Sequence, residues 1–303
     1  MYKWSEYFQN PHFLEMSRMM ILNRDAAGYV SGKIGLRPGM KALDVGCGTG
    51  AFTFYLADTT DGVEYSGLDN DDVFIAEANR LKESRKDGNR YSFTTGDALH
   101  LPYEDDSFDC VFSHTFLTSI PDYVGAIREM KRVVRPGGVV ASMTAMTLYN
   151  QTVFPGIWPA ERYPWYIRFS ELNAKVQNLY QQLVPLKDYA SGIQPAAVPY
   201  VMSLLGLRQV SAYPVGKFFS LSNAAMKRED KRRFLELEEL SEEERLEAVR
   251  HLPGAGQYLT DEEAEEYIAI RKERRDALIR DMDGNLTWEW MGDASLLVCG
   301  VKE

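Results

Sequence analysis

Glycines alternate with other residues in the segment Ala42-Leu-Asp-Val-Gly-Cys-Gly-Thr-Gly-Ala51, which is the clearest candidate for a ligand-binding motif in the sequence. The apolar residues before the first glycine predict a short buried strand, and a helix is expected to begin near Gly50. Glycine lets the backbone pass close to a ligand, and the free N–H groups at the start of a helix can face that ligand. The segment therefore predicts a binding turn formed by Gly46, Cys47, Gly48 and Gly50, with Asp44 just before it.

The spacing of these glycines bears on the kind of ligand. Nicotinamide-dependent oxidoreductases show the pattern G-x-G-x-x-G. Here the third glycine comes one residue early, and Asp44 stands before the first. The spacing favours a ligand without a pyrophosphate, while a tight strand-to-helix turn without any ligand is the simpler alternative.

Acidic residues follow the next two predicted strands. Asp69 ends a strand expected at about 63–68, where a carboxylate can accept both hydroxyls of a ribose or merely cap a loop. Asp97 follows a strand expected at 91–95, where it could accept the exocyclic amine of an adenine. A fourth strand, expected at 108–113, would present its end beside the reactive centre of such a ligand.

These motifs, in this order, resemble the S-adenosylmethionine-dependent methyltransferases with a Rossmann-like fold, in particular the group that modifies small molecules. The resemblance covers about residues 30–145, a helix and strand near 198–215 and the last strand, and the turn at 135–138 also matches. It implies S-adenosyl-L-methionine as cofactor, with the glycine turn around its methionine part. The implied cofactor-binding residues are Asp44, Gly46, Cys47, Gly48, Gly50, Asp69, Asn70, Asp97, Ala98, Leu99, Ser113 and His114.

Strands alternate with helices over the first half of the chain, which predicts a parallel sheet covered on both faces. With the resemblance, the expected fold is α/β: a Rossmann-like, doubly wound, mostly parallel seven-stranded sheet with an antiparallel last strand. We expect a single methyltransferase domain over 1–303. Its core is predicted at about 31–145, 195–217 and 292–303.

The remaining segments predict a helical and aromatic cap, since long stretches without sheet pattern often form lids. They are an N-terminal helical lid over 1–30 and insertions at about 146–194 and 218–291. The second insertion looks like three helices, with possible capping boxes at Ser241 and Thr260, but a solvated flank or dimer surface is the alternative. The expected acceptor-binding residues are Trp4, Tyr7, Trp158, Trp165 and Tyr166.

Methyl transfer is an in-line displacement, so proximity and orientation can supply most of the catalysis. His114 is the candidate general base, with simple packing beside the cofactor as the alternative. Ser113-His-Thr-Phe116 lacks the Asn-Pro-Pro-aromatic sequence of amino-methylating DNA, RNA and glutamine enzymes. We therefore expect O-, N- or C-methylation of a small, partly apolar molecule. The rival functions are a non-catalytic S-adenosylmethionine sensor or scaffold and a nicotinamide oxidoreductase.

The amino-acid composition limits the kinds of binding partner that we expect. The 303 residues carry a formal net charge of −10, which gives no hint of a nucleic-acid-binding face. No signal-peptide pattern or bilayer-length apolar stretch occurs, so no membrane association is expected. Cys47, Cys110 and Cys299 form no CxxC pair, which predicts reduced thiols in a cytoplasmic protein and no metal site. The oligomeric state is not predicted.

Overall fold

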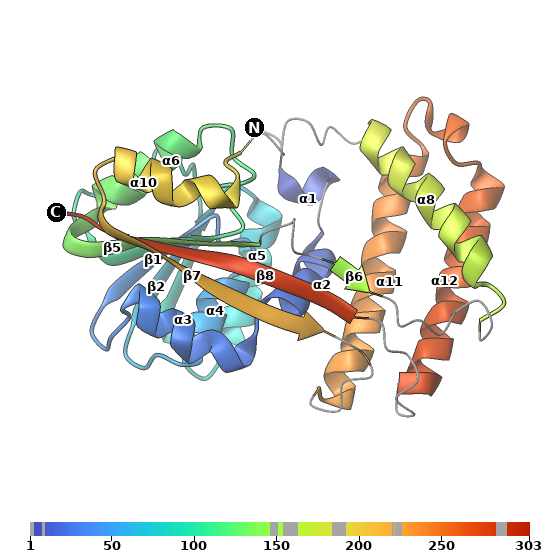
Figure 1. Ribbon diagram of the computed structural model, residues 1–303, viewed down its shortest axis with the longest axis horizontal. Helices are drawn as coiled ribbons and strands as arrows, with labels where there is room; N and C mark the ends of the chain where they lie inside the picture. The colour runs from blue at the N-terminus through green and yellow to red at the C-terminus, as the bar shows by residue number, and fades with distance from the viewer. Residues whose placement is uncertain are drawn as a thin grey trace. The chain divides into compact units, whose positions relative to one another are not determined.

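The computed structural model describes residues 3–7, 10–145, 151–153, 163–183, 192–219, 221, 226–282 and 290–303 (Figure 1). The chain divides into two compact units. The sheet unit comprises Arg18–Asn150, Lys187–Lys217 and Asp293–Glu303. The helical unit comprises Met1–Ser17, Gln151–Leu186 and Phe218–Gly292.

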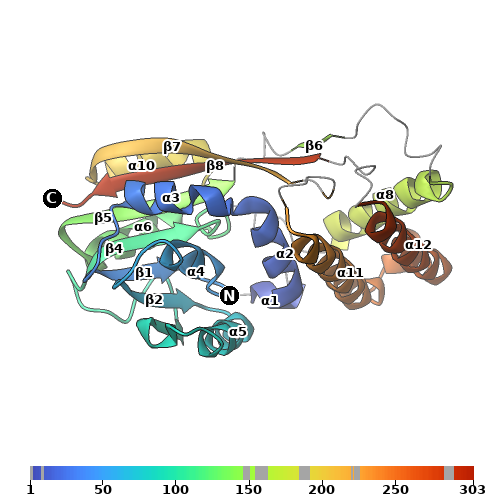
Figure 2. The same ribbon diagram turned by 90° about the horizontal axis from the view of Figure 1, so that it is seen from below.

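Five parallel strands form the centre of the sheet unit, in the order β3-β2-β1-β4-β5. Strand β8 continues this order and runs antiparallel to β5, and β7 pairs with β8. Figure 2 shows the strands from β2 at the lower edge to β8 and β7 at the upper edge. The strands are β1 (Lys41–Val45), β2 (Glu64–Asp69), β3 (Tyr91–Thr95), β4 (Phe108–His114), β5 (Val134–Ala145), β7 (Arg208–Phe219) and β8 (Trp290–Val301).

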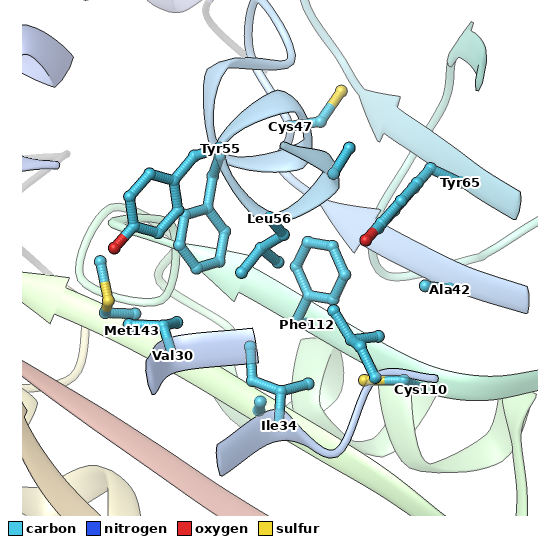
Figure 3. Packing of buried hydrophobic residues seen from close by; sticks show 14 of the residues in the cluster. Val30, Ile34, Ala42, Cys47, Tyr55, Leu56, Tyr65, Cys110, Phe112 and Met143 are labelled. Carbon is cyan, nitrogen blue, oxygen red and sulfur yellow. The ribbon is translucent and has the colours of Figure 1, made fainter. Parts of the chain in front are cut away.

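Helices cover both faces of this sheet, which confirms the predicted Rossmann-like, doubly wound class. One buried apolar cluster joins α3, α4 and α5 to one face, and a second joins α6 and α10 to the other. Figure 3 shows part of the first cluster, with Ile34 of α3, Leu56 of α4 and Phe112 of β4. The helices are α3 (Ala27–Ile34), α4 (Ala51–Ala57), α5 (Asp72–Glu83), α6 (Tyr123–Val133) and α10 (Val198–Leu204).

Several strand and helix boundaries differ from those expected. Strand β5 begins at Val134, so the expected turn at 135–138 lies inside its range. A short strand β6 (Gln151–Val153), which was not expected, pairs antiparallel with the first residues of β8 and brings the sheet to eight strands. The N-cap of α5 is Asp71, whose carboxylate accepts the N–H of Val73.

Several helices make up the N-terminal segment over 1–30, which was predicted as a lid. They are α1 (Trp4–Tyr7), α2 (Pro11–Ile21), the 3-10 helix η1 (Arg24–Ala26) and the start of α3. The boundary between the two units falls inside α2, so the part of this segment from Arg18 onward belongs to the sheet unit. Leu22, Ala27 and Val30 in this part are buried in an apolar core of the sheet unit.

Three long helices make up most of the described helical unit: α8 (Tyr166–Leu183), α11 (Arg228–Arg250) and α12 (Asp261–Asp281). The Thr260 hydroxyl accepts the N–H of Glu263 and the Glu263 side chain returns a contact to the N-cap, so this predicted capping box is confirmed. The predicted cap at Ser241 is wrong, because Ser241 is buried inside the continuous helix α11. Buried Leu237 and Leu246 on either side carry its apolar face through that point.

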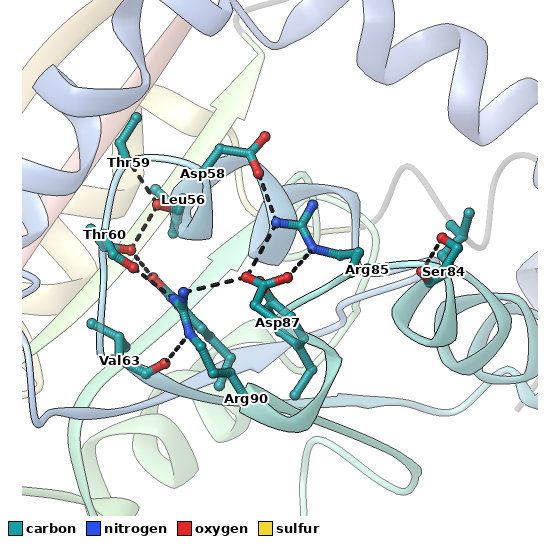
Figure 4. A network of polar contacts seen from close by, with 12 residues as sticks. Leu56, Asp58, Thr59, Thr60, Val63, Ser84, Arg85, Asp87 and Arg90 are labelled. Atoms are coloured by element: carbon teal, nitrogen blue, oxygen red, sulfur yellow. Dashed lines mark hydrogen bonds and ion pairs between the residues drawn. The ribbon is translucent and has the colours of Figure 1, made fainter.

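A polar network ties the loops at the amino end of β2 (Figure 4). Arg85 forms ion pairs with Asp58 at 2.8 Å and with Asp87 at 2.9 Å. Arg90 donates to the carbonyl oxygens of Thr60 and Val63. These contacts brace the sheet unit at the end of the strand opposite to Asp69.

Within the described part of the chain, no helix is long and apolar enough to cross a membrane. The same residues include no group of three or more histidine, cysteine or acidic side chains that could hold a metal ion.

Candidate functional site

The turn after β1 depends on its glycines for backbone conformation and for packing. Gly46, Gly48 and Gly50 have φ values of 73°, 53° and 76°, in the left-handed region that side chains with a Cβ atom disfavour. A Cβ at Gly46 would lie 2.3 Å from the Phe116 ring, and one at Gly50 would lie 2.8 Å from the Phe93 ring. The turn can therefore keep this path only with glycine at these positions.

Asp69 joins this turn to the end of β2. Its carboxylate accepts the N–H of Gly48 at 2.8 Å through one oxygen and the N–H of Asp71 at 3.0 Å through the other. Burial raises the pKa of Asp69 to about 6, against the lowering effect of these backbone hydrogen bonds. A carboxylate has about four acceptor positions, so Asp69 can still accept hydroxyl groups from a ligand.

Asp44, at the end of β1, is a fully buried carboxylate with an incomplete set of partners. One oxygen accepts the Thr53 hydroxyl at 2.7 Å, while Oδ1 has no hydrogen-bond partner among the described residues. Burial raises the pKa of Asp44 to about 7, although the Thr53 hydrogen bond lowers it. An unsatisfied buried oxygen is costly, which points to a cationic or hydrogen-bonding ligand at this position.

His114 ends β4 and is 4% exposed. Its ring stacks on Phe52 with 4.7 Å between centroids, and neither ring nitrogen has a hydrogen-bond partner in the described structure. Burial, and secondly the charge of Arg18, holds the pKa of His114 well below its usual value of 6.5. The imidazole is therefore neutral near neutral pH, which makes it a poor proton acceptor and leaves two polar atoms for a bound molecule.

Arg18 belongs to the same region and was missed from the sequence. Its Nη2 donates to the Thr115 hydroxyl at 2.8 Å, directly after β4. Burial lowers the pKa of Arg18 to about 10, while the charge of Asp44 acts in the opposite direction. The available signal was a basic residue among the apolar side chains of α2, whose sequence is PHFLEMSRMMI.

The loop after β3 is tied to the end of β2 by the hydrogen bond from the Gly96 N–H to the Asp69 carbonyl oxygen. In this loop the Asp97 carboxylate accepts the N–H of Leu99 at 2.9 Å and contacts His100 at 3.0 Å, and these bonds lower its pKa. Ala98 is buried between them. The structure thus places Asp97, Ala98 and Leu99 on the strand edge that also holds Asp69 and Asn70.

Two of the expected cofactor-binding side chains have other contacts. The Ser113 hydroxyl is fully buried and donates to Ser142 at 3.3 Å, between β4 and β5. Burial raises the pKa of the Cys47 thiol well above 9, so this thiol is protonated and unreactive. Neither side chain is directed to a ligand by its present contacts.

The expected acceptor-binding residues lie in the helical unit. Trp165 stacks on Tyr163 with 5.0 Å between centroids and meets Phe169 edge-on at 6.1 Å. Trp4 and Tyr166 are partly exposed. Trp158 and the side chain of Tyr7 lie outside the described residues. No contact of these aromatic residues tests their predicted role.

A sheet with this strand order, a glycine turn after β1 and an acid at the end of β2 define a Rossmann-like nucleotide-binding fold. Residues 36–177 match a family model described as a methyltransferase domain. Over this stretch the chain is similar to methyltransferases, and the predicted resemblance is confirmed.

Two curated relatives are enzymes named for small molecules. The chain is 35% identical over 156 residues to demethylmenaquinone methyltransferase of Staphylococcus aureus, which is 50% of this chain and 61% of that protein. It is 32% identical over 138 residues to sterol 24-C-methyltransferase of Schizosaccharomyces pombe, or 46% and 36% of the two chains. The chain thus spans about a third to three fifths of the length of these relatives.

A solved structure supports the fold. Phosphoethanolamine N-methyltransferase 2 of Haemonchus contortus, in complex with phosphomonomethylethanolamine and S-adenosylhomocysteine, superposes with a TM-score of 0.52. The superposition covers 99% of this chain and 60% of that one, at 16% sequence identity. At this identity the similarity shows the fold alone.

Proposed function

We propose that this protein transfers a methyl group from S-adenosyl-L-methionine to an O, N or C atom of a small, partly apolar molecule. The observation that carries the proposal is the polar edge formed by the ends of β1, β2 and β4. There the glycine turn is hydrogen-bonded to Asp69, while Asp44 and His114 have buried polar atoms without hydrogen-bond partners among the described residues. The names of the sterol and menaquinone enzymes support an acceptor of the small-molecule class.

The residues present fit this cofactor. Asp69 offers a carboxylate for the two ribose hydroxyls, and the turn at 46–50 offers backbone next to the methionine part. Asn70, Asp97, Ala98 and Leu99 would face the adenine. When bound, S-adenosylmethionine supplies an electrophilic methyl group on a cationic sulfonium. A positively charged ligand also suits the unpartnered oxygen of Asp44, because it would compensate a buried negative charge.

The chain's own contribution is then binding, orientation and exclusion of water rather than acid–base chemistry. The low pKa of His114 argues against its predicted role as general base. We propose instead that the neutral imidazole makes a hydrogen bond to a bound molecule at the end of β4, with Phe52 fixing the plane of the ring.

The acceptor-binding residues stay a proposal. We propose that Trp4, Trp165 and Tyr166, together with Tyr7 and Trp158, contribute flat apolar surface for the acceptor. Support comes from the aromatic cluster around Trp165 within the helical unit. A cytoplasmic location is also proposed, and the three unpaired cysteines support it.

The two alternative functions differ in the ligand that the protein would bind. A nicotinamide oxidoreductase would bind a dinucleotide, and a sensor would bind S-adenosylmethionine without turnover. The glycine spacing and the similarity to methyltransferases favour the enzyme over both.

Calorimetry on an Asp69 variant tests the proposal. Asp69→Ala should weaken binding of S-adenosylhomocysteine by about 1.5–3 kcal/mol, because hydrogen bonds from both ribose hydroxyls to a charged group disappear. Asp105→Ala is a matched control, since Asp105 is exposed and pairs only with Arg132 in the described structure. Unchanged affinity in a folded Asp69→Ala protein would remove the ribose assignment.

A further inference from the structure

Arg18 lies near Asp44 and His114, each of which has buried polar atoms without hydrogen bonds to the described residues. Burial has the largest effect on both pKa values: it raises that of Asp44 and lowers that of His114. The charge of Arg18 also lowers both pKa values, which places the guanidinium near the ends of β1 and β4. The hydrogen bond to the Thr115 hydroxyl, at 2.8 Å, fixes it there. Thr115 itself has a φ of 51°, and its N–H donates to the carbonyl oxygen of Met143.

This arrangement is not a closed ion pair. If Arg18 served only to neutralise Asp44, the carboxylate would be expected to have both oxygens satisfied. Instead, Asp44 Oδ1 and both nitrogens of His114 are buried without hydrogen bonds in the described structure. Since buried polar atoms are almost always paired, these three atoms mark a place where a polar ligand is bound.

The charges at this place are ordered. The carboxyl group of Asp44 lies at the end of β1, and the positive guanidinium of Arg18 lies near it on α2. The methionine part of the proposed cofactor carries an ammonium and a carboxylate on one carbon atom. A carboxylate bound near Asp44 alone would be repelled, whereas the planar guanidinium offers a fork of N–H donors that matches it.

We propose that Arg18 binds the α-carboxylate of the methionine part of S-adenosylmethionine, and so makes binding depend on the cofactor's amino-acid end. This inference rests on the proposed function. Arg18 is then a specificity-determining residue. The other predicted cofactor-binding residues lie at or just after the ends of strands. Arg18 differs from them because it lies in helix α2.

Two ligands separate this role from a structural one. S-adenosylhomocysteine carries the amino-acid end, whereas 5′-methylthioadenosine keeps the adenine and ribose but lacks it. Their dissociation constants would be measured by calorimetry in the full-length wild type, Arg18→Gln, Arg18→Lys and Arg128→Gln. Arg128 is the matched control, because it is an exposed arginine of α6 in the same unit.

Arg18→Gln should weaken S-adenosylhomocysteine about tenfold to a hundredfold, because a charge-assisted hydrogen bond is lost. Methylthioadenosine should change by less than about threefold, and Arg18→Lys should recover part of the loss because it keeps the charge without the fork. Arg128→Gln should match the wild type for both ligands.

The other outcomes overturn one claim or the other. Equal weakening of both ligands, or no weakening of either, overturns the role of Arg18 and leaves the proposed cofactor standing. If the wild type itself binds neither ligand, the proposed function falls, and this inference falls with it. If Arg18→Gln does not fold, Arg18→Lys decides, and an unchanged ratio of the two affinities overturns the inference.

Discussion

Asp44 is a buried acid whose ionisation should be visible in the pH dependence of stability. Its carboxyl group is fully buried, and burial raises its pKa to about 7. The folded state therefore holds a proton, between about pH 4 and 7, that the unfolded chain has released. Because the folded-state pKa is the higher one, the stability linked to this group is present at low pH and is lost as the pH rises to 7.

Asp44→Asn should consequently flatten the pH dependence of stability. Between pH 5 and pH 8 the free energy of unfolding of the wild type should fall by roughly 2–4 kcal/mol more than that of the variant. Urea unfolding at the two pH values measures the difference, with Asp105→Asn as the exposed control. Parallel pH profiles for wild type and Asp44→Asn would show that Asp44 is not a destabilised buried acid.

Some residues of the proposed site can be picked out from the sequence, and others cannot. Asp44, Gly48 and Asp69 could be found because each belongs to a local pattern of strand, glycine and acid. Arg18 and Thr115 could not, since their importance comes from a contact between α2 and the end of β4. The burial of His114, which argues against a base role, also could not be predicted, because it depends on the tertiary packing around the ring.

At the scale of elements, the turn from β1 into α4 should tolerate no side chain at its centre. Gly48 combines a φ of 53° with an N–H bonded to Asp69, so Gly48→Val would strain the backbone and fill the space next to it. We expect this variant to lose the thermal shift produced by S-adenosylhomocysteine. Gly35→Val is the control for strain alone, because Gly35 has a φ of 84° but open space at its Cβ position. A full thermal shift in Gly48→Val would mean that the pocket is elsewhere.

The contribution of the capping box at the start of helix α12 can be tested by mutation. Thr260→Ala removes the hydroxyl that accepts the Glu263 N–H, and should destabilise the protein by about 1 kcal/mol. Ser241→Ala should cost less, because Ser241 lies inside α11 and caps nothing. Chemical denaturation of both variants measures the contrast. A loss in Thr260→Ala no larger than that in Ser241→Ala would contradict this prediction.

Elements were easiest to predict where one physical signal dominated. The apolar runs of β1, β2 and β4 located those strands within about two residues. The early start of β5 and the short β6 escaped prediction, because both depend on backbone pairing with another strand rather than on side-chain pattern. Helix α11 was divided wrongly at Ser241, since a Ser–Glu spacing suits a cap and a helix interior alike.

For the whole molecule, cofactor binding and acceptor binding should be separable. The methyltransferase match covers residues 36–177, and the residues that fit the cofactor lie in the sheet unit. The aromatic side chains proposed for the acceptor lie in the helical unit. The two kinds of residue should therefore respond differently to mutation.

Trp165→Ala and Tyr166→Ala should impair turnover or acceptor affinity once an acceptor is found, while S-adenosylmethionine affinity stays within a few fold. The physical reason is that each substitution removes flat apolar surface without touching the glycine turn or Asp69. Ile167→Ala is a matched control, because Ile167 is 62% exposed on the same helix. A large loss of cofactor affinity in either aromatic variant, with the fold intact, would contradict the separation.

The most direct test of the central claim is a calorimetric titration of the full chain with S-adenosylhomocysteine, and in parallel with NADH. We expect saturable binding of one S-adenosylhomocysteine per chain and no measurable binding of NADH. Saturable NADH binding without S-adenosylhomocysteine binding would contradict it, and would make the glycine turn a dinucleotide site.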